Sequence, residues 1–484
     1  MLARAVTHAL VGLDARRVEV EAHVQSGLPS FRIVGLADRA CQEARERVRS
    51  GIAAAELEFP EGRVTVNLAP AELRKEGSGF DLPIALALLA ASRQVPRDRL
   101  QGHAAVGELA LDGRLRRVGG VLAVAEAARR HGLERILCPR DSAQEATLAG
   151  IEPVPVRHLA DAVAYLRGEH QPEPVPPPAR GETPALADLA DVRGQERARR
   201  ALEIAAAGGH NLLLGGPPGT GKTMLARRLP GILPPLDEEA ALEVTRIHSV
   251  AGLLPTDQPL LEHPPFRAPH HSASTAAIVG GGPGIRPGEA SLAHRGVLLL
   301  DELAEFARPS LEALRQPLED GYVSVARAAG RAVFPARFQL VGTMNLCPCG
   351  ARGDPLVECT CSAQRLARYR DKLSRALLDR FDLVLAVPRA RAEELAAPRA
   401  EPSAAVRARV VAARERLRAG APERVPEADA LLSNAVERLP LSGRGRARVA
   451  RVAGTIAALA AADSVLPEHV AEALAYRAPQ ELAA

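Results

Sequence analysis

The sequence contains no tryptophan, and its 484 residues include only eight phenylalanines and four tyrosines. Proteins that hold single-stranded nucleic acid by stacking its bases use aromatic side chains to do so. This scarcity therefore argues against a base-stacking platform. Lysine is nearly absent too and occurs only at positions 75, 222 and 372, so almost every basic residue is arginine. A lysine inside a motif is correspondingly informative.

Long hydrophobic runs are also missing. No apolar stretch approaches the roughly 18 residues that a membrane-spanning helix needs, and the first residues lack the apolar core of a signal peptide. We therefore expect a cytoplasmic protein with no membrane contact. The net charge is only +4, and 25% of the residues are charged, as in an ordinary soluble protein. Such a balance does not by itself indicate nucleic-acid binding, for which a local basic surface matters more.

The patterns along the chain predict an α/β protein of three domains. Residues 1–168 combine alternating strand patterns with an apolar helix and should form an α/β domain. Residues 169–185 are rich in proline and should form an extended linker. Residues 186–395 alternate apolar strands with helices, which is typical of a parallel sheet covered by helices. Residues 396–484 carry helical patterns without a convincing strand and should form a helical lid.

Several elements can be placed more closely from their periodicity. Alternation predicts strands over residues 18–24 and 63–68, and an apolar run predicts a buried helix over 81–91. Helical patterns in the C-terminal part cover residues 404–417, 427–439, 443–461 and 467–476.

The clearest motif is a glycine-rich loop between an apolar strand and a helix. Residues 216–223 match the pattern G-x-x-x-x-G-K-[ST] and are Gly216, Pro217, Pro218, Gly219, Thr220, Gly221, Lys222 and Thr223. The glycines let backbone N–H groups converge on phosphate oxygens, and the helix that follows contributes the positive end of its dipole. Lys222 would neutralise the β- and γ-phosphates, and Thr223 would bind Mg²⁺. The loop therefore predicts a site for ATP and Mg²⁺.

Two further strands end in residues that suit ATP hydrolysis. The apolar run 297–300 leads into Asp301 and Glu302, and the apolar run 338–344 leads into Asn345. Ligands of open α/β sheets bind at the carboxyl ends of the strands. Asp301 would hold Mg²⁺, Glu302 would act as general base toward the attacking water, and Asn345 would orient that water. The alternatives are an acidic helix N-terminus for the carboxylates and an ordinary strand-end turn for Asn345.

Two arginines are candidates for contact with the phosphates. Arg380 follows a leucine pair, and an arginine supplied by a neighbouring subunit can stabilise charge on the γ-phosphate. The alternative for Arg380 is a surface salt bridge with Asp379 or Asp382. Arg444, at the start of a lid helix, is a candidate nucleotide contact from the lid. Arg446 and Arg448 are its rivals in the same stretch.

Four of the six cysteines crowd into fifteen residues. Cys347, Cys349, Cys359 and Cys361 form two C-x-C pairs, whereas Cys41 and Cys138 are isolated. Four thiolates are the number that a closed structural zinc site needs, although the usual spacing within a pair is two to four residues. The sequence therefore predicts a Zn²⁺ site. The alternative is a cluster of reduced thiols.

A hairpin signature lies between the second and third ATP-site segments. Residues 321–327 and 331–334 alternate around Ala328, Ala329 and Gly330, and Arg327 and Arg331 flank the tip. These arginines are candidates for contact with DNA phosphates, which would make binding largely independent of base sequence. The alternative is a solvated hairpin face.

Additional segments resemble one known family. They are residues 266–274 (FRAPHHSAS), the glycine run 280–282, residues 286–294 (RPGEASLAH) and residues 347–350 (CPCG). Together with the ATP motifs they are similar to the ComM/YifB family of bacterial AAA+ ATPases, which is related to the magnesium-chelatase motor subunit. The resemblance covers the whole chain. It implies an ATP-driven hexameric ring that translocates on DNA and promotes branch migration of recombination intermediates during natural transformation, with the predicted hairpin pointing into the pore.

The N-terminal domain resembles the Lon-type protease domain, which uses a Ser–Lys dyad. Residues 74–79 match the nucleophile region loosely, with Gly79 near the nucleophile position and Ser78 beside it. Residues 119–122 match the second loop, but Leu122 stands where the lysine should be. A serine without a base is a poor nucleophile. We therefore expect a catalytically degenerate domain.

Two other functions remain open from the sequence. One is a magnesium-chelatase-type motor subunit that drives metal insertion into a porphyrin, and the other is an AAA+ remodeller of protein partners. The Lon-like domain and the cysteine cluster are not expected in the chelatase subunit. Stimulation of ATP turnover by DNA, by porphyrin partner subunits or by neither separates the three.

Overall fold

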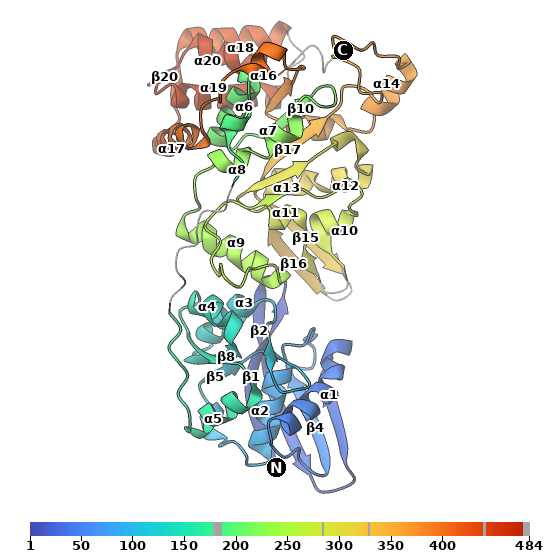
Figure 1. Cartoon of the computed structure of the whole chain (residues 1–484), viewed down its shortest axis with the longest axis vertical. Coiled ribbons are helices and arrows are strands. Elements are labelled where there is room, and N and C mark those ends of the chain that lie inside the picture. Colours follow the sequence, from blue (N-terminus) through green and yellow to red (C-terminus); the bar gives the residue numbers. More distant parts are fainter. Residues whose placement is uncertain (177, 179–185, 283–284, 328–329, 439–441, 478–484) are drawn as a thin grey trace.

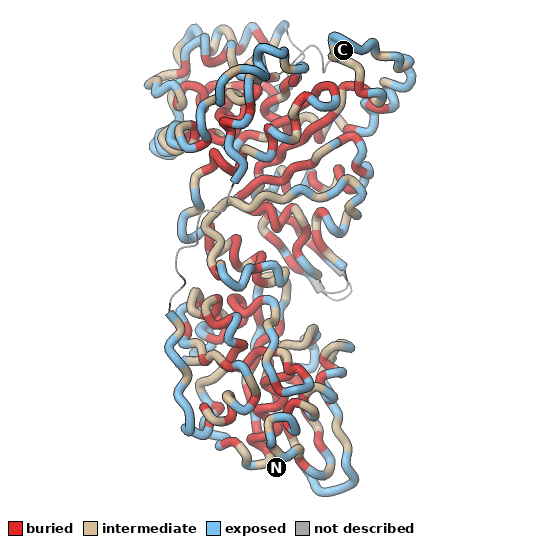
Figure 2. Tube along the Cα trace, viewed as in Figure 1, coloured by how far each residue is buried: buried red, intermediate tan, exposed pale blue. Residues whose placement is uncertain are grey.

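The computed structural model describes residues 1–176, 178, 186–282, 285–327, 330–438 and 442–477. The chain is elongated: the N-terminal α/β domain lies at one end, a central domain follows, and a helical domain covers the far end (Figure 1). Buried residues concentrate inside each of the three parts (Figure 2). The α/β class predicted from the sequence is confirmed. The expected linker 169–185 lies partly outside the described residues.

The N-terminal domain is built on a seven-stranded mixed sheet. Its strand order is β3-β4-β2-β1-β5-β8-β9. The strands are β1 (Leu2–Val11), β2 (Asp14–Gln25), β3 (Ser30–Val34), β4 (Arg63–Ala69), β5 (His103–Ala105), β8 (Arg135–Pro139) and β9 (Glu152–Val156). The main helices are α1 (Arg39–Ala54), α2 (Asp81–Ala91), α3 (Val121–Arg130), α4 (Ala143–Thr147) and α5 (Leu159–Arg167). The strands predicted over 18–24 and 63–68 and the helix over 81–91 are confirmed.

Helix α2 is buried along its whole length because it packs against the sheet and α1. Its first residue, Asp81, is fully buried and accepts two hydrogen bonds from the Arg47 guanidinium, at 2.6 and 3.0 Å, and one from Leu109 N. Burial raises the pKa of Asp81 to about 6, although Arg47 opposes this shift. A buried charge is tolerated only when it is paired. Arg47 therefore stabilises the fold by pairing Asp81.

The central domain contains a five-stranded parallel sheet of order β11-β14-β17-β10-β18. The strands are β10 (Leu212–Gly215), β11 (Phe266–Arg267), β14 (Val297–Leu300), β17 (Gln339–Met344) and β18 (Leu383–Ala386). Strands β10, β14 and β17 are buried at every position, as expected for a parallel sheet with both faces covered. Because all strands run the same way, their carboxyl ends share one edge.

Short helices surround this sheet. They are α6 (Glu196–Gly208), α7 (Lys222–Ala226), α8 (Leu229–Ile232), α9 (Glu238–Ala251), α10 (Thr275–Val279), α11 (Glu289–Leu292), α12 (Arg308–Ala313), α13 (Arg315–Asp320), α14 (Ala363–Arg370), α15 (Arg375–Leu378) and α16 (Ala392–Ala396). Two antiparallel ribbons project from the domain: β12 (Gly280–Gly281) with β13 (Arg286–Pro287), and β15 (Tyr322–Arg327) with β16 (Gly330–Pro335). The second ribbon is the hairpin predicted from the sequence.

The C-terminal domain consists of α17 (Ser403–Ala419), α18 (Pro426–Arg438), α19 (Gly443–Leu459) and α20 (Pro467–Ala475). All four helices were predicted within about two residues. A two-residue parallel pair, β19 (Glu423–Arg424) with β20 (Ser464–Val465), differs from the expectation of helices alone. It lies between helices and is too short to give a strand pattern in the sequence.

The N-terminal domain contacts the central domain at several points, on α9 and on the hairpin. Gly120 N donates to Ser249 O of α9 at 2.8 Å, and the buried Glu145 carboxylate accepts from the Ser249 hydroxyl. The turn between β1 and β2 reaches β16, where a Cβ on Gly12 would lie 2.8 Å from the Ala332 Cβ. The N-terminal domain therefore touches the projecting hairpin as well as α9.

Among the described residues, no helix has the length and apolarity required to cross a membrane.

Loss of the Arg47 guanidinium should destabilise the N-terminal domain, because Asp81 would be left buried without a charged partner. We expect Arg47→Ala to lower its free energy of unfolding by about 3 kcal/mol in urea titrations. Adding Asp81→Asn should recover part of this loss. Arg45→Ala, on the exposed face of the same helix, is the control. Equal destabilisation by the two alanine variants would contradict the pairing role.

Candidate active site

The glycine-rich loop lies where the sequence predicts, between β10 and α7. Gly216 packs so closely on the backbone that follows β18 that a Cβ would lie 2.3 Å from Val387 O. Gly221 takes a left-handed conformation (φ 88°) as the residue that precedes α7. Both positions therefore require glycine. The loop lies at the carboxyl edge of the sheet.

Lys222 is buried inside this loop. Its Nζ donates to Gly216 O at 2.9 Å and to Pro217 O at 2.7 Å, and it lies 3.3 Å from Asn345 Oδ1. Burial lowers its pKa, while Asp301 and Glu302 oppose that shift. The structure thus brings Lys222 and Asn345 together across two strands, as their assigned roles require.

The Asp301 carboxylate connects three elements of the site. Its Oδ1 accepts from the Thr223 hydroxyl at 2.8 Å and from the Thr343 hydroxyl of β17. Thr343 Oγ1 also accepts from Glu302 N at 3.0 Å. Thr223 and Asp301 offer adjacent oxygen atoms, the donors that Mg²⁺ prefers, so these two residues suit the predicted ion. Sequence reasoning missed Thr343; its signal was the single hydroxyl in a mostly apolar strand, two residues before Asn345.

Glu302 adopts a left-handed conformation (φ 56°, ψ 49°), which is uncommon for a residue with a side chain. Its side chain is 59% exposed, and His271 Nδ1 lies 3.5 Å from Glu302 Oε2. His271 belongs to the loop after β11, the strand next to β14. Sequence reasoning assigned no role to His271, because nothing in the sequence shows that β11 and β14 are neighbours.

Arg380 lies at the opposite, amino edge of the sheet. Its carbonyl accepts from the Asn211 side chain, and Asn211 immediately precedes β10. Four residues of β10, at about 3.3 Å each, put roughly 13 Å of strand between this edge and the glycine-rich loop. Arg380 pairs with Glu319, and not with the expected alternatives Asp379 and Asp382. Those two carboxylates pair with Arg477 and Arg451.

Arg444 lies near Arg380 rather than beside the phosphate-binding loop of its own chain. Both line a cavity of about 1240 Å³ at the amino edge, and Arg444 contributes to lowering the pKa of Arg380, after burial. The physical reason is that α19 packs on α6, which carries its first turn to this edge. Of the rivals, Arg448 also lines the cavity and lies 3.6 Å from Asp382. The predicted role of Arg444 as a nucleotide contact from the lid stays a prediction.

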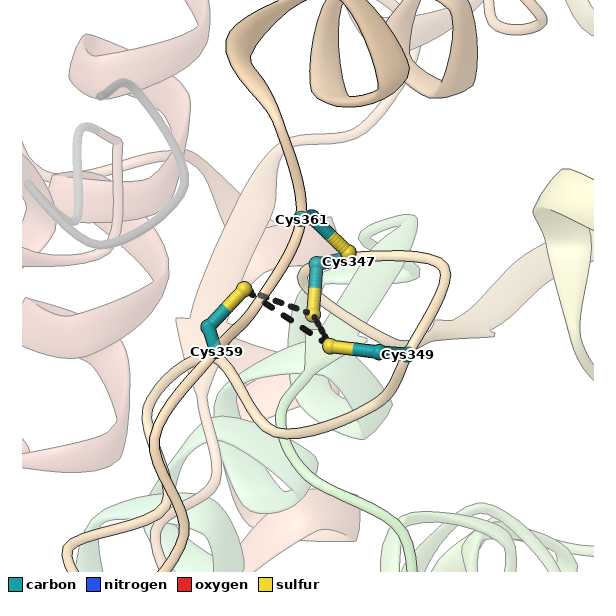
Figure 3. Close-up of side chains that lie close together, drawn as sticks. All are labelled: Cys347, Cys349, Cys359 and Cys361. Atoms are coloured by element: carbon teal, nitrogen blue, oxygen red, sulfur yellow. Dashed lines mark hydrogen bonds between the residues drawn. The ribbon is translucent and has the colours of Figure 1, made fainter.

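The four clustered cysteines converge on one point (Figure 3). Their sulfur atoms all lie within 4.8 Å of one another, and those of Cys347, Cys349 and Cys359 are 3.3–3.6 Å apart. Four thiolates around Zn²⁺, each at about 2.3 Å, would be separated by roughly 3.8 Å. The Ala351 N–H and neighbouring thiols lower the pKa of Cys349 to about 6. The number, spacing and chemistry of these donors suit Zn²⁺.

The cysteine loop also touches the glycine-rich loop. A Cβ on Gly350 would lie 2.8 Å from Pro218 Cγ, and one on Gly353 would lie 3.9 Å from Pro217 Cδ. On its other side, Asn345 O accepts from the Tyr369 hydroxyl of α14 at 3.1 Å. The cysteine loop is therefore packed between α14 and the phosphate-binding loop.

The two hairpin arginines lie on β15 and β16, on either side of residues 328–329. Arg331 is exposed, and its Nε donates to Ser324 Oγ at 3.3 Å. Arg327 ends β15, but its side chain and the tip residues 328–329 lie outside the described residues. Their contact with DNA stays a prediction.

The Lon-like site contains no Ser–Lys contact among the residues described. Ser78 donates to the Glu108 carboxylate, and Lys75 is fully buried and donates to Pro70 O. Leu122, at the position expected for the lysine, is buried in α3, and its backbone N donates to Glu145. The expectation of a catalytically degenerate protease domain stays a prediction.

Three stretches of the chain match families of the magnesium-chelatase group. Residues 188–395 match "Magnesium chelatase, subunit ChlI", residues 20–142 match "Subunit ChlI of Mg-chelatase", and residues 422–477 match "Magnesium chelatase, subunit ChlI C-terminal". The matches follow the order of the three folded parts.

Curated relatives match the chain along nearly its full length. An uncharacterised Mycobacterium tuberculosis protein is 47% identical, over 98% of both chains. The uncharacterised protein YifB of Escherichia coli is 44% identical, over 98% of this chain and 97% of its own. Competence protein ComM of Haemophilus influenzae is 41% identical, over 99% of this chain and 97% of its own. With these relatives and the phosphate-binding geometry described above, the chain belongs to the ComM/YifB family of magnesium-chelatase-like AAA+ proteins.

Proposed function

We propose that this protein is an ATP-driven motor that works as a homo-oligomeric, hexameric ring on DNA and promotes branch migration of recombination intermediates. The observation that carries the ATPase part is the network around Asp301. It joins Thr223 of the phosphate-binding loop to Thr343 and to the backbone of Glu302, next to Lys222. This arrangement has the groups that phosphoryl transfer needs: a phosphate cradle, oxygen ligands for Mg²⁺ and a carboxylate base.

The position of Arg380, at the edge of the sheet opposite to the phosphate-binding loop, supports assembly into a ring. An arginine at the amino edge cannot serve a nucleotide at the carboxyl edge of its own sheet. A head-to-tail neighbour would bring one edge against the other, and such contacts close into rings. Arg380, with Arg444 beside it, would then face the phosphates of the next protomer. We therefore assign both arginines to a site shared between subunits.

The proposed action on DNA is supported by the projecting hairpin and by the relatives. The hairpin carries the exposed Arg331 and, at the end of β15, Arg327. Arginines without aromatic partners favour contact with backbone phosphates, independent of base sequence. The Haemophilus influenzae relative is called a competence protein, which agrees with a role on recombining DNA.

A chelatase-type motor is the second candidate, because the matched families are described as magnesium-chelatase subunits. A remodeller of protein partners is the third. ATP turnover measured with branched DNA, with porphyrin-bearing chelatase partners and with neither tests the three. We expect DNA to stimulate turnover, and stimulation by the chelatase partners alone would overturn the proposal.

The cysteine cluster is proposed to hold one structural Zn²⁺ through Cys347, Cys349, Cys359 and Cys361. The ion would fix the loop that packs on Pro217 and Pro218, and so help to hold the phosphate cradle in shape. It would carry no part of the reaction itself, since a site closed by four cysteines leaves no open position.

Removing the two central charges of the ATP site should have different effects. Lys222→Ala should abolish nucleotide binding, because it removes the cation that faces the phosphates. Glu302→Gln should bind ATP normally but turn it over on the order of 100-fold more slowly, because the base is lost. Equilibrium binding and steady-state turnover measure the two steps. If Glu302→Gln turns ATP over at the wild-type rate, Glu302 is not the general base.

Arg380→Ala should still bind ATP but lose about 1000-fold in turnover if it acts on a neighbouring nucleotide. Mixing it with Lys222→Ala should restore part of the activity, because some interfaces would combine an intact Lys222 with an intact Arg380. The mixed assemblies must be shown to form, for example with two tags. If the mixed assemblies form but no ATP turnover is restored, the result would contradict action of Arg380 on a neighbouring subunit.

Protein purified without chelator should contain about one zinc per chain by elemental analysis. Cys359→Ser should lower the zinc content, the thermal stability and the DNA-stimulated turnover, while nucleotide binding survives. Thr360→Ser, in the same loop, is the control and should change none of these. Well-folded, active wild-type protein with far less than one zinc would show that the cluster is reduced thiols.

A further inference from the structure

Two apolar side chains are exposed together on the cysteine loop, residues 347–361, and neither the ATP site nor the cysteine cluster uses them. Leu356 is 74% exposed and Val357 is 52% exposed. Because they are neighbours in the sequence, they form one apolar projection, which we call the apolar tip. A single exposed leucine needs no explanation, whereas apolar side chains that are exposed side by side on a fixed loop indicate a contact surface.

The apolar tip is held in a fixed conformation. Asp354 Oδ1 accepts from Leu356 N at 2.9 Å, and Asp354 Oδ2 accepts from the Arg389 guanidinium at 3.3 Å. The Asp354 side chain is only 9% exposed. Arg389 follows β18, so this pair attaches the tip to the carboxyl edge of the sheet, while the four cysteines gather the two ends of the loop. A projection that is already ordered loses little conformational entropy on binding, which favours its use as a contact.

The apolar tip lies on the side of the central domain that carries the phosphate-binding loop. Gly350 and Gly353 of the cysteine loop pack on Pro218 and Pro217. Helix α14, which follows the cysteine loop, and helices α8 and α9 lie on opposite sides of the central domain (Figure 1). The head-to-tail ring proposed above puts the carboxyl edge of one chain against the amino edge of the next. The apolar tip is therefore adjacent to the proposed contact between subunits.

The amino edge has a surface that suits the apolar tip. The cavity there has an apolar wall of half-buried side chains, Pro234, Leu236, Leu318 and Phe338. Arginines outnumber carboxylates among the residues that line the rest of the cavity, whereas the exposed residue that follows the apolar tip, Glu358, is acidic. The two surfaces are therefore complementary in both apolarity and charge.

We propose that the apolar tip docks on the apolar wall at the amino edge of a second copy of this chain. The proposal rests on the proposed function, because it takes a ring of identical subunits. The cysteine loop packs on Pro217 and Pro218, so docking of its tip holds the phosphate-binding loop against the edge that carries Arg380 of the next subunit. Assembly and completion of the shared nucleotide site are thereby one event.

The test follows assembly of the full-length protein by sedimentation across protein concentrations, with a non-hydrolysable ATP analogue. Leu356→Ser should raise the concentration at half-assembly on the order of tenfold, because it removes the burial of one leucine. ATP binding and thermal stability should not change. Leu356→Met, which keeps an apolar side chain of similar size, should assemble normally. Leu111→Ser is the matched control, since Leu111 is 63% exposed but lies in the N-terminal domain.

The occupant of the apolar wall is identified by a photo-crosslinking residue, benzoylphenylalanine, in place of Val357. Crosslinks to residues 234–236, 318 or 338 of another chain support the proposal. Crosslinks to DNA, to the same chain or to another surface of the second chain overturn it. Assembly of Leu356→Ser at the wild-type concentration also overturns it, as does an equal shift in Leu111→Ser.

Stimulation of ATP turnover by branched DNA is measured on the same wild-type protein, so that the two proposals fail separately. If the wild-type protein assembles but DNA does not stimulate it, the proposed action on DNA fails, and the assembly of Leu356→Ser still decides the role of the tip. If DNA stimulates turnover and Leu356→Ser assembles normally, only the docking proposal fails. Wild-type protein that stays monomeric overturns both the ring and the docking.

Discussion

The Asp301 carboxylate is the interaction on which the site depends. It directly follows β14 and accepts hydrogen bonds from hydroxyl groups of the phosphate-binding loop and of β17. It therefore fixes the relative position of three segments that are far apart in the sequence. The same Thr343 hydroxyl that donates to Asp301 accepts from the backbone of Glu302. The residues that we propose to bind Mg²⁺ and to act as the base are therefore positioned by one small polar network at the edge of an apolar sheet. Because the strands beneath it are buried at every position, this network has little room to shift.

The parallel direction of the strands imposes the second constraint. It gathers the phosphate cradle and carboxylates at one edge and leaves Arg380 and Arg444 at the other, beside a large cavity. In our proposal, one chain thus carries two half-sites that face away from each other. A ring of identical subunits is the simplest assembly in which each half-site meets its complement, and this is why we place catalysis between protomers.

Part of this site could be predicted from the sequence because its signals are local. The loop 216–223 has a fixed spacing, and Asp301 and Asn345 each follow an apolar strand directly. The two C-x-C pairs are an equally local signal. The contacts of Thr343, His271 and Glu319 could not be predicted, because they depend on strand order and on packing between distant segments. The position of Arg444 depends on how the lid helices dock on α6, which no helical pattern specifies.

For the fold, too, local patterns could be predicted from the sequence and tertiary contacts could not. Helix α2 was predicted closely because it is one apolar run, and the four C-terminal helices because their sequences show helical patterns. The buried Asp81–Arg47 pair and the contact of Gly12 with Ala332 had no signal in the sequence, because each joins residues that only the tertiary structure brings together.

The central claim is that ATP is hydrolysed between subunits of a ring on DNA. It is tested most directly by measuring ATP turnover per chain across a range of protein concentrations, with and without branched DNA, while the oligomeric state is followed by sedimentation. We predict that turnover per chain rises steeply as hexamers form, because only then does Arg380 meet a nucleotide, and that DNA raises it further. Turnover per chain that is the same for monomers and assemblies, and is unaffected by DNA, would contradict the account.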